Sequence, residues 1–246
     1  MLETIRRWVG GTPEGRPDWS AVAAWAARRH GVFKRARDDQ GFVVDGMFEG
    51  RPWRLEWGPP QRSYIAEREL RLRMELGLPP DLQMLLMSRP LMETLERQTF
   101  ERYTEQLQTQ IDVATPEEMR WLAMLPKVVL SAERDFKVRF GAVALAPKLA
   151  ARWIEGDLAS RLGTAAGGAL AGEPALVLMT LRGRLYLRLQ LRAPEPAAID
   201  AAVGVFECAA AQALRLVGVP PEGPEAWPTT ATTAWQTQLQ PEPAKD

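Results

Sequence analysis

Cysteine and histidine each occur once in this chain of 246 residues, as Cys208 and His30. A lone cysteine excludes an internal disulfide framework, and one histidine beside it leaves no His/Cys set of the kind that holds zinc. Basic and acidic residues balance at 31 each, so no bulk field attracts nucleic acid or membranes. We therefore expect no metal site and a reducing, cytoplasmic compartment.

Long apolar runs and targeting signals are also missing. No stretch approaches the roughly 18 consecutive apolar residues of a membrane-spanning helix. The first residues, MLETIRRWVGG, lack the apolar core of a signal peptide. The sequence therefore predicts a soluble protein without a membrane span.

The known catalytic and cofactor motifs are absent as well. There is no Walker A lysine, no G-x-S-x-G, no H-E-x-x-H and no paired C-x-x-C. His30 stands before a glycine, where a cationic side chain suits a helix end, and Cys208 lies in an alanine-rich helical pattern that suits a small packing residue. A Cys208 nucleophile would need His30 as its base, since no other imidazole exists. We predict no catalytic residue, no cofactor and no enzymatic activity.

What the sequence does contain is a clear hairpin over residues 175–192, ALVLMTLRGRLYLRLQLR. Leucine alternates with polar residues from position 185 onward, which is typical of a half-buried strand. The preceding run is apolar on both faces, as in an interior strand. With Arg182-Gly183 as the turn, Leu178 faces Leu187, and one side of the hairpin is a leucine surface. A helix predicted over residues 197–216 is its obvious cover.

The opposite side of this hairpin is the main candidate binding face. It carries Arg184, Tyr186, Arg188 and Arg192, with Arg182 at the turn. Arginines around an aromatic ring on an open sheet can hold single-stranded nucleic acid through phosphate contacts and base stacking. The zero net charge of the chain favours an ordinary solvated face instead.

A second hairpin is predicted over residues 42–57, FVVDGMFEGRPWRLEW. Asp45-Gly46 and Glu49-Gly50 both suit a tight turn, but the first would leave a strand of only about three residues. The Glu49-Gly50 turn places Gly46 opposite Trp53, so that an indole covers bare backbone.

The same register decides between two roles for the carboxylates of this hairpin. Asp45 and Glu56 could in principle work as a catalytic carboxylate pair. However, Asp45 faces Arg54 across the strands, whereas Glu56 faces Val43. An opposite-charge cross-strand pair is therefore the better account of Asp45.

The remaining segments complete an α+β fold, with antiparallel hairpins covered by helices. Residues 1–110 and 111–217 are two candidate lobes of this fold. We expect further strands over residues 69–76, 82–87, 128–130 and 135–145. We expect further helices over residues 18–30, 90–108, 116–125 and 147–162, and a flexible loop over residues 163–173. Glu118 is expected to complete a capping box with Thr115.

Residues 218–246 differ in composition from the rest of the chain. Proline, threonine and glutamine dominate, and Trp227 and Trp235 stand isolated. This composition predicts a disordered tail. Such tryptophans can anchor a segment in the groove of a partner, or the tail can be passive.

Two short motifs carry a resemblance. Gly46 to Arg51 has the form Gly-x-x-x-Gly-Arg at a hairpin turn, and Phe136 and Phe140 have the spacing Phe-x-x-x-Phe in a predicted strand. With these motifs, the order of segments over roughly residues 19–216 resembles a family of uncharacterised bacterial proteins, a domain of unknown function. Lys137 stands where that pattern has aspartate. The resemblance implies a fold rather than an activity.

Two functions are consistent with these observations. The first is a non-enzymatic protein-interaction or accessory module, with another protein as its partner. The second is a binder of anionic ligands or single-stranded nucleic acid that uses the Arg/Tyr face of the strand at residues 184–192. Balanced charge and the tryptophan-bearing tail favour the first.

Overall fold

The computed structural model describes residues 18–36, 40–105, 115–172 and 175–218. The predicted tail after Gly218, with Trp227 and Trp235, lies outside these residues. Described strands are β1 (Val32–Arg35), β2 (Phe42–Phe48), β3 (Arg51–Gly58), β4 (Glu69–Glu75), β5 (Met84–Ser88), β6 (Phe140–Ala144), β7 (Leu176–Leu181) and β8 (Arg184–Gln190). Described helices are α1 (Ser20–Arg28), α2 (Arg89–Glu105), α3 (Glu117–Met124), α4 (Arg134–Arg139), α5 (Pro147–Ile154), α6 (Asp157–Gly167) and α7 (Pro196–Gly218).

All the described strands belong to one antiparallel sheet in the order β1-β2-β3-β4-β8-β7-β5-β6, which confirms the α+β fold class. Strand β5, from the first predicted lobe, lies between β7 and β6, from the second. The two candidate lobes therefore share a sheet.

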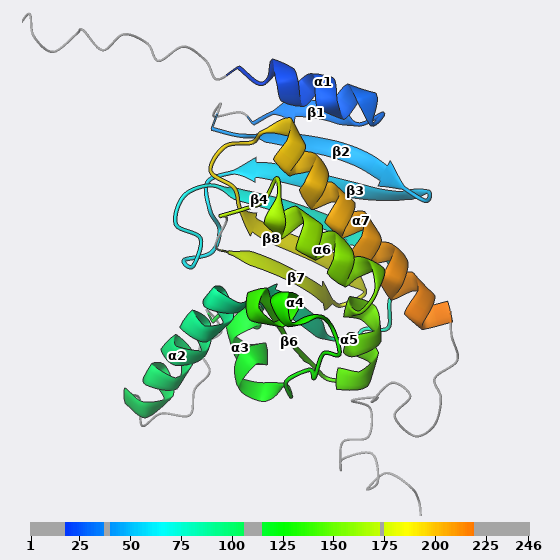
Figure 1. The fold of residues 1–246 in the computed structure, drawn as a ribbon. Coiled ribbons are helices and arrows are strands. Elements are labelled where there is room, and N and C mark those ends of the chain that lie inside the picture. The colour runs from blue at the N-terminus through cyan, green and yellow to red at the C-terminus, as the bar shows by residue number, and fades with distance from the viewer. Residues whose placement is uncertain (1–17, 37–39, 106–114, 173–174, 219–246) are drawn as a thin grey trace, which may run out of the picture.

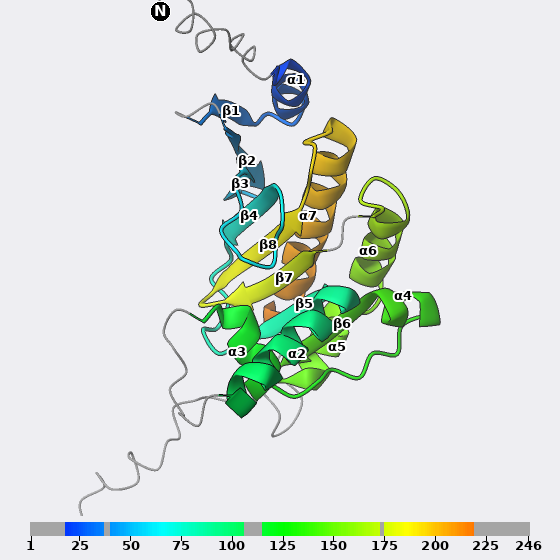
Figure 2. The ribbon, with the colours of Figure 1, turned by 90° about the vertical axis from the view of Figure 1, so that its left-hand side faces the viewer.

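Helices cover the two faces of the sheet unequally. On one face α1, α4, α5, α6 and α7 pack over a large apolar core that runs from β2 to β6 (Figure 1). On the other face α2 and α3 pack over β5, β6 and β7 (Figure 2), and Glu118 of α3 lies 3.7 Å from Arg188 of β8. Among the described residues no helix covers this second face over β2, β3 and β4.

The central hairpin has the predicted register. Leu178 pairs with Leu187, and Arg182 and Gly183 form the turn with φ of 50° and 80°. The leucine side is fully buried beneath α7, as expected, with Ile199 and Phe206 of that helix also fully buried. By length and composition α7 could cross a membrane, and half of its apolar stretch is buried inside the protein.

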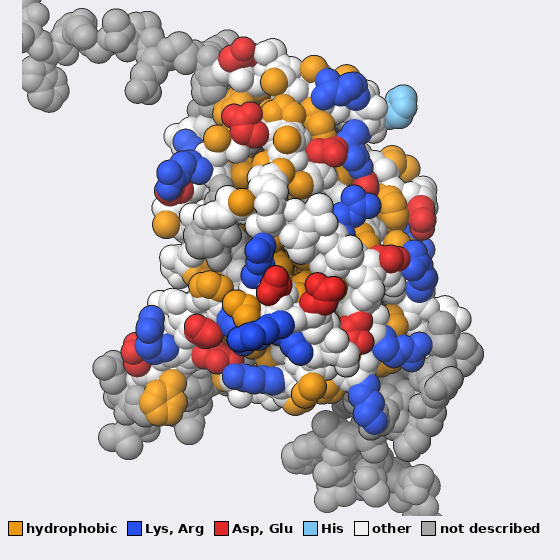
Figure 3. All heavy atoms as spheres, in the orientation of Figure 1, with side chains coloured by type: hydrophobic (Ala, Val, Ile, Leu, Met, Phe, Trp, Pro, Cys, Tyr) orange, Lys and Arg blue, Asp and Glu red, His pale blue; other side chains and the backbone are white. Residues whose placement is uncertain are grey.

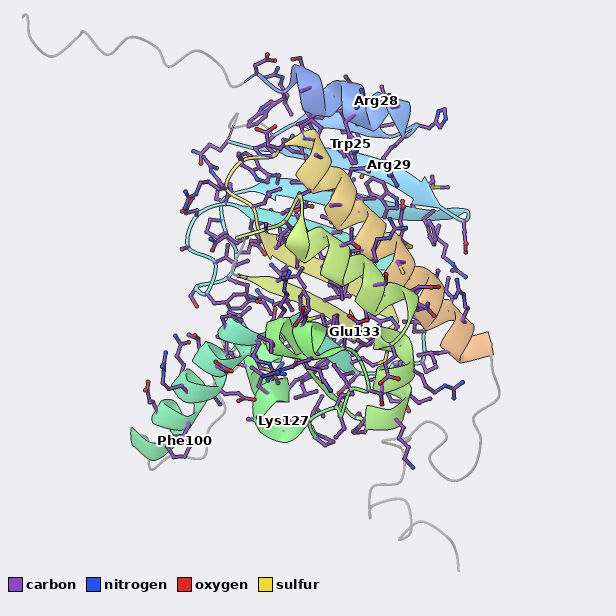
Figure 4. The ribbon with its side chains drawn as sticks, in the orientation of Figure 1. Trp25, Arg28, Arg29, Phe100, Lys127 and Glu133 are labelled. Carbon is purple, nitrogen blue, oxygen red and sulfur yellow. The ribbon has the colours of Figure 1, made fainter. Side chains whose placement is uncertain are left out.

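Helix α1 is tied to α7 by polar contacts as well as by packing. The indole Nε1 of Trp25 donates to Asp200 at 3.0 Å. Arg29 spans two carboxylates, at 2.9 Å from Asp200 and 2.7 Å from Glu207. Trp25 and Arg29, which are labelled in Figure 4, extend from α1 toward α7. The first helix is thereby fixed to the last one across the end of the sheet.

Four predictions of secondary-structure elements were wrong. Residues 128–130 form no strand, although the preceding Lys127 makes an isolated bridge to Val143. Residues 134–139 form α4 rather than a strand, since a spacing of four residues suits a helical turn as well as a strand. Phe136 of α4 still contacts Phe140, the first residue of β6, with ring centroids 5.0 Å apart. The helix predicted over residues 147–162 is broken at Gly156, whose φ of 83° ends α5 before α6 begins. Helix α6 then continues to Gly167, into the predicted loop.

The first hairpin has the predicted Glu49-Gly50 turn, and Gly46 pairs with Trp53. A Cβ atom on Gly46 would lie 2.2 Å from Cζ2 of Trp53, so alanine at this position must displace the indole. We expect Gly46→Ala to lower the free energy of unfolding by about 1–3 kcal/mol through overpacking. Urea denaturation followed by tryptophan fluorescence measures the loss.

Gly163→Ala is the matched control for that substitution. Gly163 lies inside α6, and a Cβ atom there meets nothing within 4 Å. We expect a gain of about 0.5–1 kcal/mol from the helix propensity of alanine. Equal effects of the two substitutions would show that the indole does not cover Gly46 in solution.

Candidate functional site

The second face of β2, β3, β4 and β8 carries a continuous set of polar side chains, which we call the charged face. It is covered around Glu69 and Arg188 by α3 and the segment before β4. The register aligns Asp45, Arg54, Arg73 and Tyr186 in one row across β2, β3, β4 and β8. A second row runs from Glu56 through Arg71 to Arg188, and a third pairs Glu75 with Arg184. Three of the five predicted arginine and tyrosine positions, Arg184, Tyr186 and Arg188, therefore lie on the charged face.

Each arginine predicted on β8 or just after it contacts a carboxylate of this chain. Arg184 Nε lies 2.6 Å from Glu75 Oε2, and Arg192 makes a bidentate pair with Glu67, both bonds at 2.7 Å. Arg188 donates to the buried carboxylate Glu69. A phosphate would have to compete with these carboxylates for the same guanidinium groups.

The other two predicted residues of this hairpin have different surroundings. Arg182 at the turn is 80% exposed and lies 4.0 Å from Glu117. Tyr186 is half-buried and packs with Tyr64 and Leu181 against the apolar cluster beneath α2 and α3. Its ring is therefore partly covered, which limits stacking on a nucleic-acid base.

The densest part of the charged face is a cluster that sequence reasoning missed. Two carboxylates, Glu69 at the start of β4 and Glu118 in the first turn of α3, are completely buried. Glu69 accepts hydrogen bonds from the backbone N–H of Gln61 at 2.6 Å and from Arg71 at 3.3 Å, besides the one from Arg188. The cluster fixes the segment before β4 to the sheet.

Glu118 joins α3 to the same cluster. Its Oε1 accepts from Arg62 Nε at 3.1 Å and from the Tyr64 hydroxyl at 3.0 Å, and Arg188 Nε lies 3.7 Å away. Its Oε2 is buried and has no hydrogen-bond partner in the described part of the chain. The predicted capping box was wrong, because no side chain caps α3 and Glu118 points toward the sheet.

Electrostatics fits an ion-pair network rather than an acid–base site. Hydrogen bonding from Arg54 holds the pKa of Asp45 below its usual value, so this carboxylate stays ionised. Burial, together with Glu118, raises the pKa of the Tyr64 phenol, so it stays a neutral donor. The Asp45–Arg54 pair, at 2.7 Å, is the predicted cross-strand ion pair.

The residues weighed for nucleophilic or metal chemistry lie elsewhere. Cys208 lines a groove between α6 and α7, and burial raises the pKa of its thiol. His30 follows α1 with φ of 56° and is not part of that lining. Within the described ranges no group of three or more His, Cys, Asp or Glu residues could hold a metal ion.

Comparisons with known protein families, curated proteins and solved structures give no match to this chain. The site therefore has to be interpreted from its own geometry.

Proposed function

We propose that this chain is a non-enzymatic protein-binding module whose partner docks on the charged face. The observation that carries the proposal is the half-covered sheet: α2 and α3 lie over β5, β6 and β7 and reach β8, but within the described residues no helix lies on this face over β2, β3 and β4. An open face of this extent offers strands, rather than loops, as a rigid surface for another protein.

The chemistry of the charged face suits a protein better than a polyanion. Arginine, tyrosine and methionine are enriched at protein interfaces, and this face carries Arg54, Arg73 and Tyr186. It is bordered toward β1 by two exposed apolar side chains, Val32 at 55% and Met47 at 61%. Because most of its charges are already paired within the chain, the face offers directed hydrogen bonds rather than a strong positive field.

The test is native mass spectrometry of the protein isolated gently from its own host. The wild-type chain should carry a stoichiometric protein partner, and the double variant R54E/R73E should lose it. R134E/R152E is the matched control, since it reverses two exposed arginines on α4 and α5, which pack on the other face of the sheet. A bare wild-type chain, or a partner retained by R54E/R73E, would contradict the proposal.

The alternative function, an anionic-ligand or single-stranded nucleic-acid binder, has its own discriminating variant. Arg184 and Arg188 are the arginines of β8 that such a ligand would contact. If they bind phosphate, R184A/R188A should abolish a salt-sensitive binding signal in the anisotropy of a labelled oligonucleotide. Under our proposal, the wild type and this variant give the same weak signal.

A further inference from the structure

A second candidate site lies on the opposite side of the sheet, in a hollow of about 420 Å³ between α4, α6 and the ends of β5 to β8. Its walls are mostly apolar. They are formed by Pro90, Val138, Phe140, Leu162, Ala165, Ala166, Leu170, Leu176 and Leu189, with Ser88, Arg139 and Gly172 as the remaining lining residues. Its size falls within the range of about 300–1,000 Å³ that is typical of small-molecule sites.

The hollow exists because small residues of α6 face long ones of the sheet. Ala165 and Ala166 of α6 line it together with Leu176 and Leu189 of the sheet, and Leu162, one turn earlier, is buried in the core. The hollow is open to solvent on one side, where Val138 and Arg139 are exposed, so an alkyl chain can enter it and remove apolar surface from water.

One cation stands in this lining. Arg139 is the last residue of α4, and its side chain is exposed. A Cβ atom on Gly167 would lie 3.8 Å from Arg139 Nη1, so the guanidinium reaches across to the end of α6. In the described part of the chain, no carboxylate forms an ion pair with Arg139, in contrast to Arg184 and Arg188 on the charged face.

The surroundings of Arg139 strengthen its preference for an anion. Helix α4 also carries the exposed residues Arg134 and Lys137, against one exposed acidic residue, Asp135. Basic side chains gather in the region of α4 on the face of the molecule that includes α6 (Figure 3). A guanidinium binds a carboxylate through two parallel hydrogen bonds, which a neutral head group cannot match.

We propose that this hollow binds a carboxylate with a single alkyl chain, with the chain against Leu162, Leu176 and Leu189 and the carboxylate on Arg139. Its volume suits one chain rather than the two of a membrane phospholipid. This site is separate from the proposed protein-binding face, because the leucines of β7 and β8 point away from Arg188 and Tyr186.

Isothermal titration calorimetry of the full chain with decanoate tests the proposal. The wild type should bind decanoate saturably at one site, and decanol at least about tenfold more weakly, as expected for loss of a charge-assisted hydrogen bond. Arg139→Gln should weaken decanoate binding by about the same factor, and Arg139→Lys should retain part of it. Arg134→Gln, on the same helix but outside the lining, should leave it unchanged.

Ala166→Trp tests the hollow itself, because an indole at this half-buried position would occupy the space of the alkyl chain. It should abolish decanoate binding while the thermal unfolding curve stays cooperative. Absence of saturable binding to the wild type would overturn the proposal. So would equal binding of decanoate by the wild type and Arg139→Gln, a surface variant that does not disturb the core.

Discussion

Glu118→Ala is expected to lower the free energy of unfolding by about 3–5 kcal/mol, the usual cost of removing one partner from a buried ion pair. The Glu118 side chain is completely buried, and its Oε1 accepts hydrogen bonds from Arg62 and Tyr64. In the alanine variant, Arg62 and Tyr64 would lose this hydrogen-bond acceptor, and Arg188 would lose a nearby counter-charge. Urea denaturation monitored by circular dichroism gives the difference.

Two variants separate this effect from a general weakening of α3. Glu117→Ala removes the neighbouring carboxylate, which is partly exposed and pairs with Arg120 one turn along the helix, so its cost should stay below about 1 kcal/mol. Glu118→Gln should cost less than alanine, because its amide oxygen can still accept from Arg62 while its NH₂ takes the place of the unpartnered Oε2. If Glu118→Ala were no more costly than Glu117→Ala, the buried cluster would not hold α3 on the sheet.

That cluster marks the limit of what the sequence could predict. Both hairpins were predicted with their correct registers, because period-two alternation and the turn glycines Gly50 and Gly183 are local signals. The pairing of β4 with β8 is not local, since it joins Glu69 to Gln190 across more than a hundred residues. No short-range pattern specifies such a partner, so the shared sheet could not be predicted.

The same lack of a local signal applies to the carboxylates that pair with the arginines of the charged face. Sequence alternation placed Arg184 and Arg188 on one side of β8, but their counter-charges come from β4 and α3. A carboxylate at the helix start, Glu118, has an obvious local role as a cap, and that role hid the long-range one. Glu118 lies on the side of α3 that faces the sheet. A charged residue at such a helix position is the signal that could have indicated its long-range role.

Trp153→Ala is the second large effect that we expect, with a loss of about 3–5 kcal/mol, as for other fully buried aromatic residues. Trp153 has 0% exposure in the core between α5 and α7, and its Nε1 donates to the Ala209 carbonyl at 2.9 Å. Trp153 lies within the helix predicted over residues 147–162, and the structure adds the hydrogen bond that joins α5 to α7. Thermal and urea unfolding both measure the loss.

Phenylalanine substitutions at two tryptophans can isolate the hydrogen bond from the packing. Trp153→Phe removes the indole N–H that donates to the Ala209 carbonyl. Trp53→Phe removes an indole N–H that is buried and has no acceptor among the described residues. The volume change is the same, but only the first substitution breaks a hydrogen bond, and the second removes an unsatisfied donor. We expect Trp153→Phe to cost about 1–2 kcal/mol more than Trp53→Phe. Equal costs would mean that packing alone holds α5 against α7.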